Sequence, residues 1–260
     1  MLADLQRRYQ SYRWGEPELR LVGRLADPRR IAIDVGGYDG EYTRAMKRHA
    51  RACLTFEPNP RKYALLQQTL AGPSVRLFPI ALSDHPGHTR LFLPQGHDHF
   101  EGCATIDPAN PAFGHGVGYD VETARLDDLG IADPVGLVKI DVEGHELAVL
   151  RGAVALLQRD HPNLIVEAEE RHRPGAVATL RDFLEPLGYR GYFLHQRRLL
   201  DVGAFDADVH QDVDKLGTDG YALNFLWSVA PDFPATLQPA LGAQAWSDSR
   251  LRALGHALFG

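Results

Sequence analysis

Short runs of hydrophobic residues alternate along the chain with segments of mixed polarity. The runs occupy residues 31–35, 52–56, 75–81, 135–140 and 163–166, and continuous apolar runs of this length are typical of parallel strands covered on both faces. Between them apolar residues recur at helical spacing, as at 41–50, 60–70 and 146–157. The alternation predicts an α/β fold with a doubly wound, mostly parallel sheet, which strands at 189–195 and 223–229 extend to seven.

The same pattern predicts one large domain with additions. Residues 1–26 have apolar positions at helical spacing and predict an N-terminal helical cap, which could also form the contact of a homodimer. Residues 27–230 form the main domain, interrupted at 85–134 by a segment that is too long for a simple connection, so we expect a lid over a binding site. The acidic loop 201–219 is interpreted as a solvated surface, and residues 231–260 as a Pro-rich C-terminal tail.

Composition narrows the choice of partners. The net charge is −6, and Lys and Arg are nowhere concentrated beyond short pairs, which disfavours a nucleic acid partner. No apolar segment approaches the roughly twenty residues that a membrane helix needs, and the first residues mix charged with apolar positions, unlike a secretory signal. Two distant cysteines, Cys53 and Cys103, indicate reduced thiols. We therefore expect a cytoplasmic protein with no membrane partner.

The first strand runs into a glycine turn that is suited to ligand binding. The sequence reads Ile31-Ala-Ile-Asp-Val-Gly-Gly-Tyr-Asp-Gly40. Gly36 and Gly37 lack a Cβ, so the backbone can turn tightly there and leave room for a ligand. A helix that begins after Gly40 directs its free N–H groups and the positive end of its dipole at the turn.

The acids beside this turn indicate the kind of ligand. A dinucleotide-binding fingerprint needs glycines where Tyr38 and Glu41 stand. Instead Asp34 lies on the strand itself, which suits the cationic amino acid end of a ligand. Glu57 stands at the tip of the second strand, where an acid is the usual partner of a ribose diol. Together these features favour S-adenosylmethionine.

Several motifs, in this order, resemble those of the FkbM family of S-adenosylmethionine-dependent methyltransferases. They are Ile33-Asp-Val-Gly-Gly-Tyr-Asp-Gly40, Phe56-Glu-Pro-Asn-Pro60, Ala81-Leu-Ser-Asp84, Arg125-Leu-Asp-Asp-Leu129, Lys139-Ile-Asp-Val-Glu-Gly-His-Glu146 and Leu150-Arg-Gly-Ala153. The resemblance covers about residues 30 to 230 and implies the Rossmann-like fold of class I methyltransferases. It also implies methylation of hydroxyl groups on sugars, polyketides and other natural products.

The resemblance assigns roles to single residues around the cofactor. It implies that the methionine part is surrounded by Asp34, Gly36 and Gly40, that Glu57 binds the ribose hydroxyls, and that Ser83 and Asp84 lie near the adenine. Gly37 departs mildly from the family, in which many members have a small or amide residue at this position.

The fourth strand carries the candidate catalytic residues. Methyl transfer to an alcohol requires an aligned nucleophile and removal of its proton. Asp141 and Glu143 are two residues apart, so in extended backbone they face the same side, next to His145. We expect Asp141 nearest the transferred methyl group and Glu143 or His145 as the base. Glu143 and Glu146 have the alternative role of helix N-terminal acids, preferred for Glu146, and Lys139 either pairs with an acid or reaches out at the strand end.

Acids at the end of the fifth predicted strand are candidate ligands of a metal ion. Glu167 and Glu169 tip this strand, and with Asp141 they could hold Mg²⁺, which prefers oxygen ligands and would acidify the acceptor hydroxyl. Alternatively, Glu167 binds the acceptor or pairs with Arg171 or Arg173.

The sequence thus predicts an S-adenosylmethionine-dependent O-methyltransferase. Its expected partner is a small molecule with a hydroxyl group, such as a sugar or a glycosylated or polyketide metabolite. One alternative is an NAD-dependent Rossmann oxidoreductase, against which the missing third glycine and the absence of a Tyr-x-x-x-Lys dyad argue. The other is a non-catalytic binding protein that retains the fold.

Overall fold

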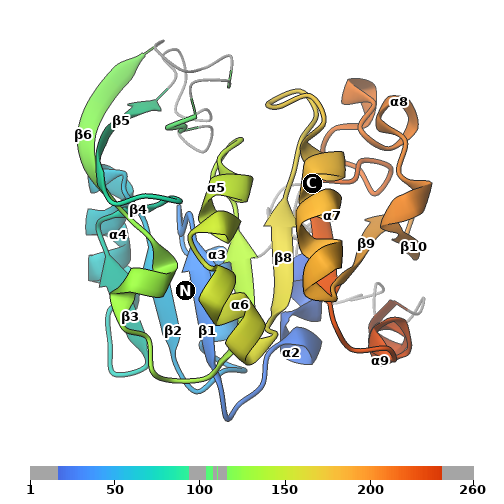
Figure 1. Ribbon diagram of the computed structural model, residues 1–260, viewed down its shortest axis with the longest axis horizontal. Coiled ribbons are helices and arrows are strands. Elements are labelled where there is room, and N and C mark those ends of the chain that lie inside the picture. The colour runs from blue at the N-terminus through green and yellow to red at the C-terminus, as the bar shows by residue number, and fades with distance from the viewer. Residues whose placement is uncertain (1–16, 94–103, 108–109, 111–115, 242–260) are drawn as a thin grey trace, which may run out of the picture.

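The hydrophobic runs form the strands of one central sheet. The computed structural model describes residues 17–93, 104–107, 110 and 116–241, and in these ranges eight strands pair in the order β10-β9-β11-β8-β7-β1-β2-β3 (Figure 1). In this order they span Arg198–Asp201, Arg190–His195, Asn224–Ser228, Asn163–Glu167, Val135–Ile140, Ile31–Val35, Cys53–Phe56 and Val75–Phe78. The five strands from β8 to β3 pair in parallel, and β11, β9 and β10 pair antiparallel with their neighbours. The predicted doubly wound sheet is confirmed, with β10 added.

The register brings the ends of the central strands together. Val35 at the end of β1 pairs with Phe56 of β2 and with Ile140 of β7, and Ile140 pairs with Val166 of β8. Because these strands are parallel, the residues that follow them all emerge at one edge of the sheet, where open α/β sheets bind their ligands.

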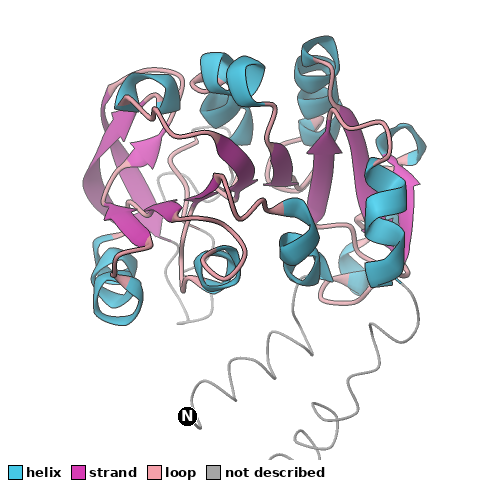
Figure 2. Cartoon of the chain, turned by 90° about the horizontal axis from the view of Figure 1, so that it is seen from below, coloured by secondary structure: helices cyan, strands magenta, loops and turns pink. Residues whose placement is uncertain are grey.

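Helices cover both faces of the sheet, as Figure 2 shows from below. Alternate strand residues point to opposite faces, so Ile33 and Val35 join one core cluster and Ala32 another. The first cluster includes residues of α5 (Glu146–Arg151), α6 (Val154–Asp160) and α7 (Ala176–Leu184), which is followed by η4 (Glu185–Leu187). The second includes residues of η1 (Pro17–Leu21), α2 (Val22–Leu25), α3 (Glu41–Met46) and α9 (Phe233–Leu241). Helix α4 (Pro60–Leu70) contacts β3, and Asn59 caps it by accepting from Arg61 N.

The segment between β3 and β7 forms a second, smaller sheet. Strands β4 (Ala81–Leu82), β6 (Val117–Ala124) and β5 (Gly87–Leu93) pair in this order, followed by η3 (Leu126–Leu129). Residues 104–107 return to β5, since Phe92 and Thr105 exchange backbone hydrogen bonds of 2.9 and 3.0 Å. The rest of the expected lid, at 94–103, 108–109 and 111–115, lies outside the described residues.

The acidic loop 201–219 is more structured than the sequence suggests. It contains η5 (Val202–Ala204), α8 (Ala207–His210) and η6 (Val213–Lys215). The buried Gln211 side chain donates to Ala168 O and Ala222 O and accepts from Glu170 N. The loop therefore supports the segment that follows β8.

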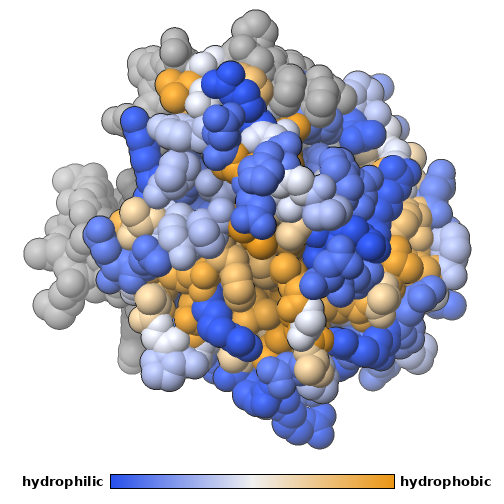
Figure 3. Space-filling model, turned by 60° about the vertical axis from the view of Figure 1, so that its left-hand side comes forward, coloured by the Kyte–Doolittle hydropathy of each residue, from blue (hydrophilic) through white to orange (hydrophobic). Residues whose placement is uncertain are grey.

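The last features of the fold are the two ends of the chain and the surface. The expected loose tail is helical from the start in α9, whereas 1–16 of the expected cap and 242–260 lie outside the described residues. On the face shown in Figure 3, hydrophobic residues gather in the middle and hydrophilic residues surround them. Among the described helices, none is long and apolar enough to cross a bilayer.

Candidate active site

A cavity of about 280 Å³ lies at the edge of the sheet where β1, β2, β7 and β8 end. Its polar side chains come from the strand ends, which contribute Tyr38, Glu57, Asn59, Asp141, Glu143 and Glu167 beside Gly36 and several apolar residues. The segment between β3 and β7 contributes apolar residues, which are Ile80, Ala81, Leu82, Leu91, Ala104 and Ile106. The volume is close to the lower end of the range of ligand pockets, about 300–1,000 Å³.

The glycine turn after β1 is fixed by its neighbours. Gly36 has a φ of +83°, and a Cβ there would lie 1.8 Å from Asp141 O, so only glycine fits between β1 and β7. Gly40 has a φ of +79°, and a Cβ there would lie 2.3 Å from Leu70 Cδ1. Of the two predicted cofactor glycines, Gly36 lines the cavity and Gly40 packs against α4.

Asp34 lies beneath the cavity rather than in its wall. Its side chain is buried and accepts a hydrogen bond of 2.5 Å from Thr43 Oγ1 of α3. Burial raises the pKa of Asp34 to about 6. The residue ties α3 to β1, and the expected contact with the methionine part stays a prediction.

Glu57 stands in the cavity wall, where the sequence places it. Its carboxylate accepts from Tyr38 N and Asn59 N, both at 2.7 Å. Burial raises the pKa of Glu57 to about 7, against the lowering effect of these two hydrogen bonds.

Ser83 and His145, predicted for different roles, contact each other. Ser83 Oγ lies 2.9 Å from His145 Nε2, and neither residue lines the cavity. Burial lowers the pKa of His145 and so favours the neutral ring. Asp84 does not line the cavity either; its Oδ1 accepts from Ser83 Oγ at 3.3 Å and lies 2.6 Å from His85 Nδ1.

Two of the acids at the β7 and β8 ends share a lysine. Lys139 Nζ lies 3.3 Å from Asp141 Oδ2 and 3.9 Å from Glu167 Oε2, and the lysine side chain is 1 % exposed. Of the two alternatives for Lys139, the pairing with a nearby acid is confirmed. Glu167 pairs with this lysine and with neither Arg171 nor Arg173.

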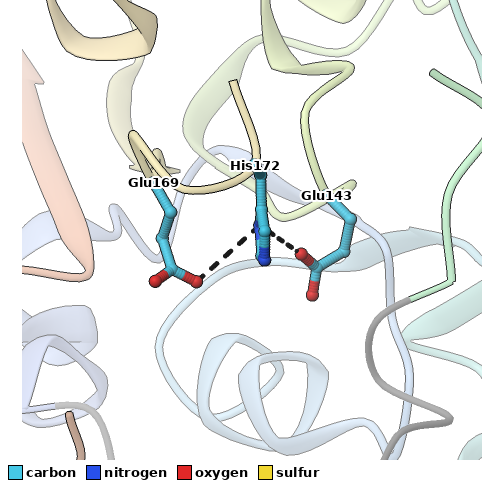
Figure 4. A group of neighbouring side chains, drawn as sticks. All are labelled: Glu143, Glu169 and His172. Atoms are coloured by element: carbon cyan, nitrogen blue, oxygen red, sulfur yellow. Dashed lines mark ion pairs between the residues drawn. The ribbon is translucent and has the colours of Figure 1, made fainter. Parts of the chain in front are cut away.

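Glu143 has a histidine partner instead. His172 Nδ1 lies 2.7 Å from Glu143 Oε2 and 3.8 Å from Glu169 Oε1, and Figure 4 shows the ring between the two carboxylates. Burial raises the pKa of Glu143. Burial opposes charge on His172 as well, but the Glu143 carboxylate outweighs it and raises the pKa of the ring.

The backbone at Glu143 is left-handed rather than extended. Its φ is +55°, a conformation that costs energy in a residue with a Cβ. The insert holds it, because Thr105 Oγ1 and Asn110 Nδ2 both donate to Glu143 O, at 2.9 and 2.7 Å. Asp107 adds an ion pair to Arg173 at 3.1 Å. The turn still directs Glu143 to the same cavity as Asp141, as predicted, although not by strand alternation.

Glu146 and Glu169 have structural partners. Glu146 begins α5 and accepts from Gly144 N at 2.9 Å, which confirms its role as an acid at the helix N-terminus; burial raises its pKa to about 7. Glu169 accepts two hydrogen bonds of 2.7 Å from Arg171 and one from Tyr221. Burial works against its charge, but these partners outweigh burial and lower the pKa of Glu169.

The acids therefore do not form the expected metal set of Asp141, Glu167 and Glu169. One group with ligand atoms within 4.8 Å of one another is Asp141, Glu143 and Glu167, and the other is Glu143, Glu169 and His172. Sequence reasoning missed Tyr38, Asn59 and His172. Asn59 and Tyr38 lie inside the motifs that were quoted, whereas no pattern links His172 to Glu143.

The fold is that of Rossmann-like methyltransferases. Residues 34–190 match the Methyltransferase FkbM domain, and the chain belongs to this family.

Three individual proteins are similar to this chain. "Methyltransferase 1" of Beauveria bassiana is 28% identical over 180 residues, which are 60% of this chain and 71% of the relative. The crystal structure of Methyltransferase FkbM from Methylobacillus flagellatus KT is 15% identical, with a TM-score of 0.51, and the match covers 78% of this chain but only 44% of that one. A Streptococcus mutans protein in complex with SAH is 11% identical, with a TM-score of 0.44 and coverage of 81% and 94%.

Proposed function

We propose that this methyltransferase transfers a methyl group from S-adenosylmethionine to a hydroxyl group of a small natural product, such as a sugar or a glycosylated or polyketide metabolite. The observation that carries the proposal is one cavity that is lined both by the Gly36 turn and Glu57 and by Asp141, Glu143 and Glu167. The first group has the features of a nucleoside site, and the second has carboxylates suited to proton transfer.

The cofactor end rests on Glu57. Its carboxylate is oriented by two backbone N–H groups and suits a ribose diol. In this proposal the acceptor approaches from the side of the insert and of the β7 and β8 ends, which line the same cavity. None of the described lining residues is Lys or Arg, which disfavours anionic acceptors.

Glu143 is the best base among the predicted catalytic residues. His145 contacts Ser83 and does not line the cavity, and Asp141 is paired with the buried Lys139. Glu143 lines the cavity, its pKa is raised, and its neighbour is a residue that can itself take up a proton. In the proposed step the acceptor oxygen forms a bond to the methyl carbon as the carbon–sulfur bond breaks, and the hydroxyl proton passes to the Glu143 carboxylate.

Calorimetric titration with S-adenosylhomocysteine and with NAD tests the cofactor. We expect micromolar binding of the adenosyl ligand and none of NAD. Glu57→Gln should weaken S-adenosylhomocysteine binding about 10- to 100-fold, because a charge-assisted hydrogen bond to the ribose is lost. Glu122→Gln, an exposed residue of β6, is the matched control and should bind as wild type.

An acceptor screen tests the reaction. The protein is incubated with S-adenosylmethionine that carries an isotopically labelled methyl group and with a panel of sugars and glycosylated metabolites. Label on an acceptor oxygen supports the proposal. Binding of the cofactor without transfer to any acceptor would favour the non-catalytic alternative, and binding of NAD alone would favour the oxidoreductase.

A further inference from the structure

The acids at the β7 and β8 ends have the chemistry of a divalent metal site. Asp141, Glu143 and Glu167 each offer a carboxylate oxygen, and these oxygens lie within 4.8 Å of one another. Hard cations such as Mg²⁺ prefer such oxygen ligands. A divalent metal ion would add two positive charges to this site. Whether it can bind depends on the basic residues that already lie there.

The chain already supplies a cation at this place. Lys139 reaches from within β7, and its Nζ lies 3.3 Å from Asp141 and 3.9 Å from Glu167. The same ammonium lies 5.0 Å from the centre of the Tyr42 ring, a favourable cation–π arrangement. With the lysine side chain 1 % exposed, bulk water scarcely screens its interaction with the two carboxylates.

The third carboxylate also has a basic neighbour. His172 Nδ1 lies 2.7 Å from Glu143 Oε2, and Figure 4 shows that Glu143 turns its carboxylate to this ring. A metal ion bound by all three acids would have to compete with His172 for the Glu143 carboxylate. It would also stand close to the buried ammonium, and two like charges in a site of low dielectric repel strongly.

We propose that Lys139 takes the place of a metal ion. Its ammonium offsets one of the two negative charges of Asp141 and Glu167 and holds both carboxylates at the cavity, so the site needs and binds no divalent cation. Lys139 is thus a positioning residue for Asp141. The inference goes beyond the proposed function, because it concerns the charge at the site and holds whichever acceptor is methylated.

Removal of the ammonium should create a metal site. Mn²⁺ binding is measured by electron paramagnetic resonance, which reports the free ion, in the absence of cofactor and acceptor. We expect Lys139→Met to bind Mn²⁺ about 10- to 100-fold more tightly than wild type, because the acids lose their compensating charge. Lys139→Arg keeps a cation and should resemble wild type. Lys62→Met is the matched control and should bind Mn²⁺ as wild type does. Lys62 Nζ lies 2.9 Å from Asp39 and 3.9 Å from the Tyr38 ring centre, so this variant also loses an ammonium that lies beside an acid and an aromatic ring.

The double variant Lys139→Met/Asp141→Asn tests whether these acids bind the Mn²⁺. It should lose the increase in Mn²⁺ affinity that Lys139→Met gains. Binding of Mn²⁺ by the wild-type protein with a dissociation constant below about 1 mM, abolished in Glu167→Gln, would overturn the proposal even if Lys139→Met fails to fold. The proposal would also be overturned if wild type and a folded Lys139→Met bound Mn²⁺ equally tightly. Because no turnover is measured, failure of the proposed methylation leaves this test unaffected.

Discussion

At the scale of single residues, the partner of each carboxylate decides its chemistry. Asp141, Glu143 and Glu167 line one cavity, but the first and third lie beside Lys139 and the second beside His172. The ion pair with the buried ammonium holds the first and third carboxylates in place. A carboxylate beside an imidazole can share a proton with it.

This difference gives a prediction for His172. His172→Phe should lower kcat about 100-fold and leave the affinity for S-adenosylhomocysteine unchanged, because the ring lies behind Glu143 and not in the cavity wall. His172→Gln retains an N–H donor for Glu143 and should recover part of the loss. Steady-state kinetics with calorimetry measure both quantities. A kcat equal to wild type in the Phe variant would remove His172 from the reaction.

At the scale of elements, the family motif around residues 125–129 caps a helix from a distance. Helix α6 has no side-chain cap of its own, but Ala155 N and Leu156 N in its first turn donate to the Asp127 carboxylate, both at 2.9 Å. Asp127 lies in η3, so this pair of hydrogen bonds fastens the end of the insert to the helix.

Asp127→Ala should therefore reduce the free energy of unfolding by about 1 kcal/mol, the usual cost of a lost N-terminal cap. The neighbouring Asp128→Ala is the control, since Asp128 is half exposed and contacts only Arg125 among the ion pairs, and its effect should stay within about 0.5 kcal/mol. Urea denaturation compares the two. Equal losses would show that the cap contributes nothing of its own.

The elements that the sequence predicts well are those with a strong local signal. Strand β1 and helix α4 follow from a doubly buried apolar run and from the Asn59-Pro60 start. The predicted strand 75–81 divides between two sheets because Pro79 has no N–H for a continued ladder. Strand β10 escapes prediction because its two-residue hairpin turn uses Gln196 and Arg197 at positive φ, where Asn-Gly is the usual signal.

At the scale of the whole molecule, the site combines residues that are distant in sequence. Glu57, Asp141, Glu143 and Glu167 are predictable as candidates because each lies at or just after the end of a strand, and parallel strand ends meet at one edge. The contact between Glu143 and His172 depends on the loop after β8, which the 201–219 segment supports through Gln211. Such contacts arise from tertiary packing, which has no periodic signature in the sequence.

The sheet edge also concentrates buried carboxyl groups whose pKa is raised, to about 6 for Asp34 and about 7 for Glu57 and Glu146. Each binds a proton more tightly in the folded than in the unfolded chain. Its contribution to stability therefore falls as pH rises from the ordinary carboxyl pKa, about 4, to the raised value, and is constant above it.

Glu146→Gln isolates one of these groups, because the amide oxygen can still accept from Gly144 N. The difference in unfolding free energy between this variant and wild type should be small at pH 4 and grow in favour of the variant, by up to about 3 kcal/mol near pH 8. Urea denaturation across this pH range measures it, with the exposed Glu122→Gln as a control that should show no such slope. A difference that is constant from pH 4 to 8 would mean that Glu146 ionises in the folded protein as it does in water, and that the hydrogen bonds from the turn at Gly144 fully compensate its burial.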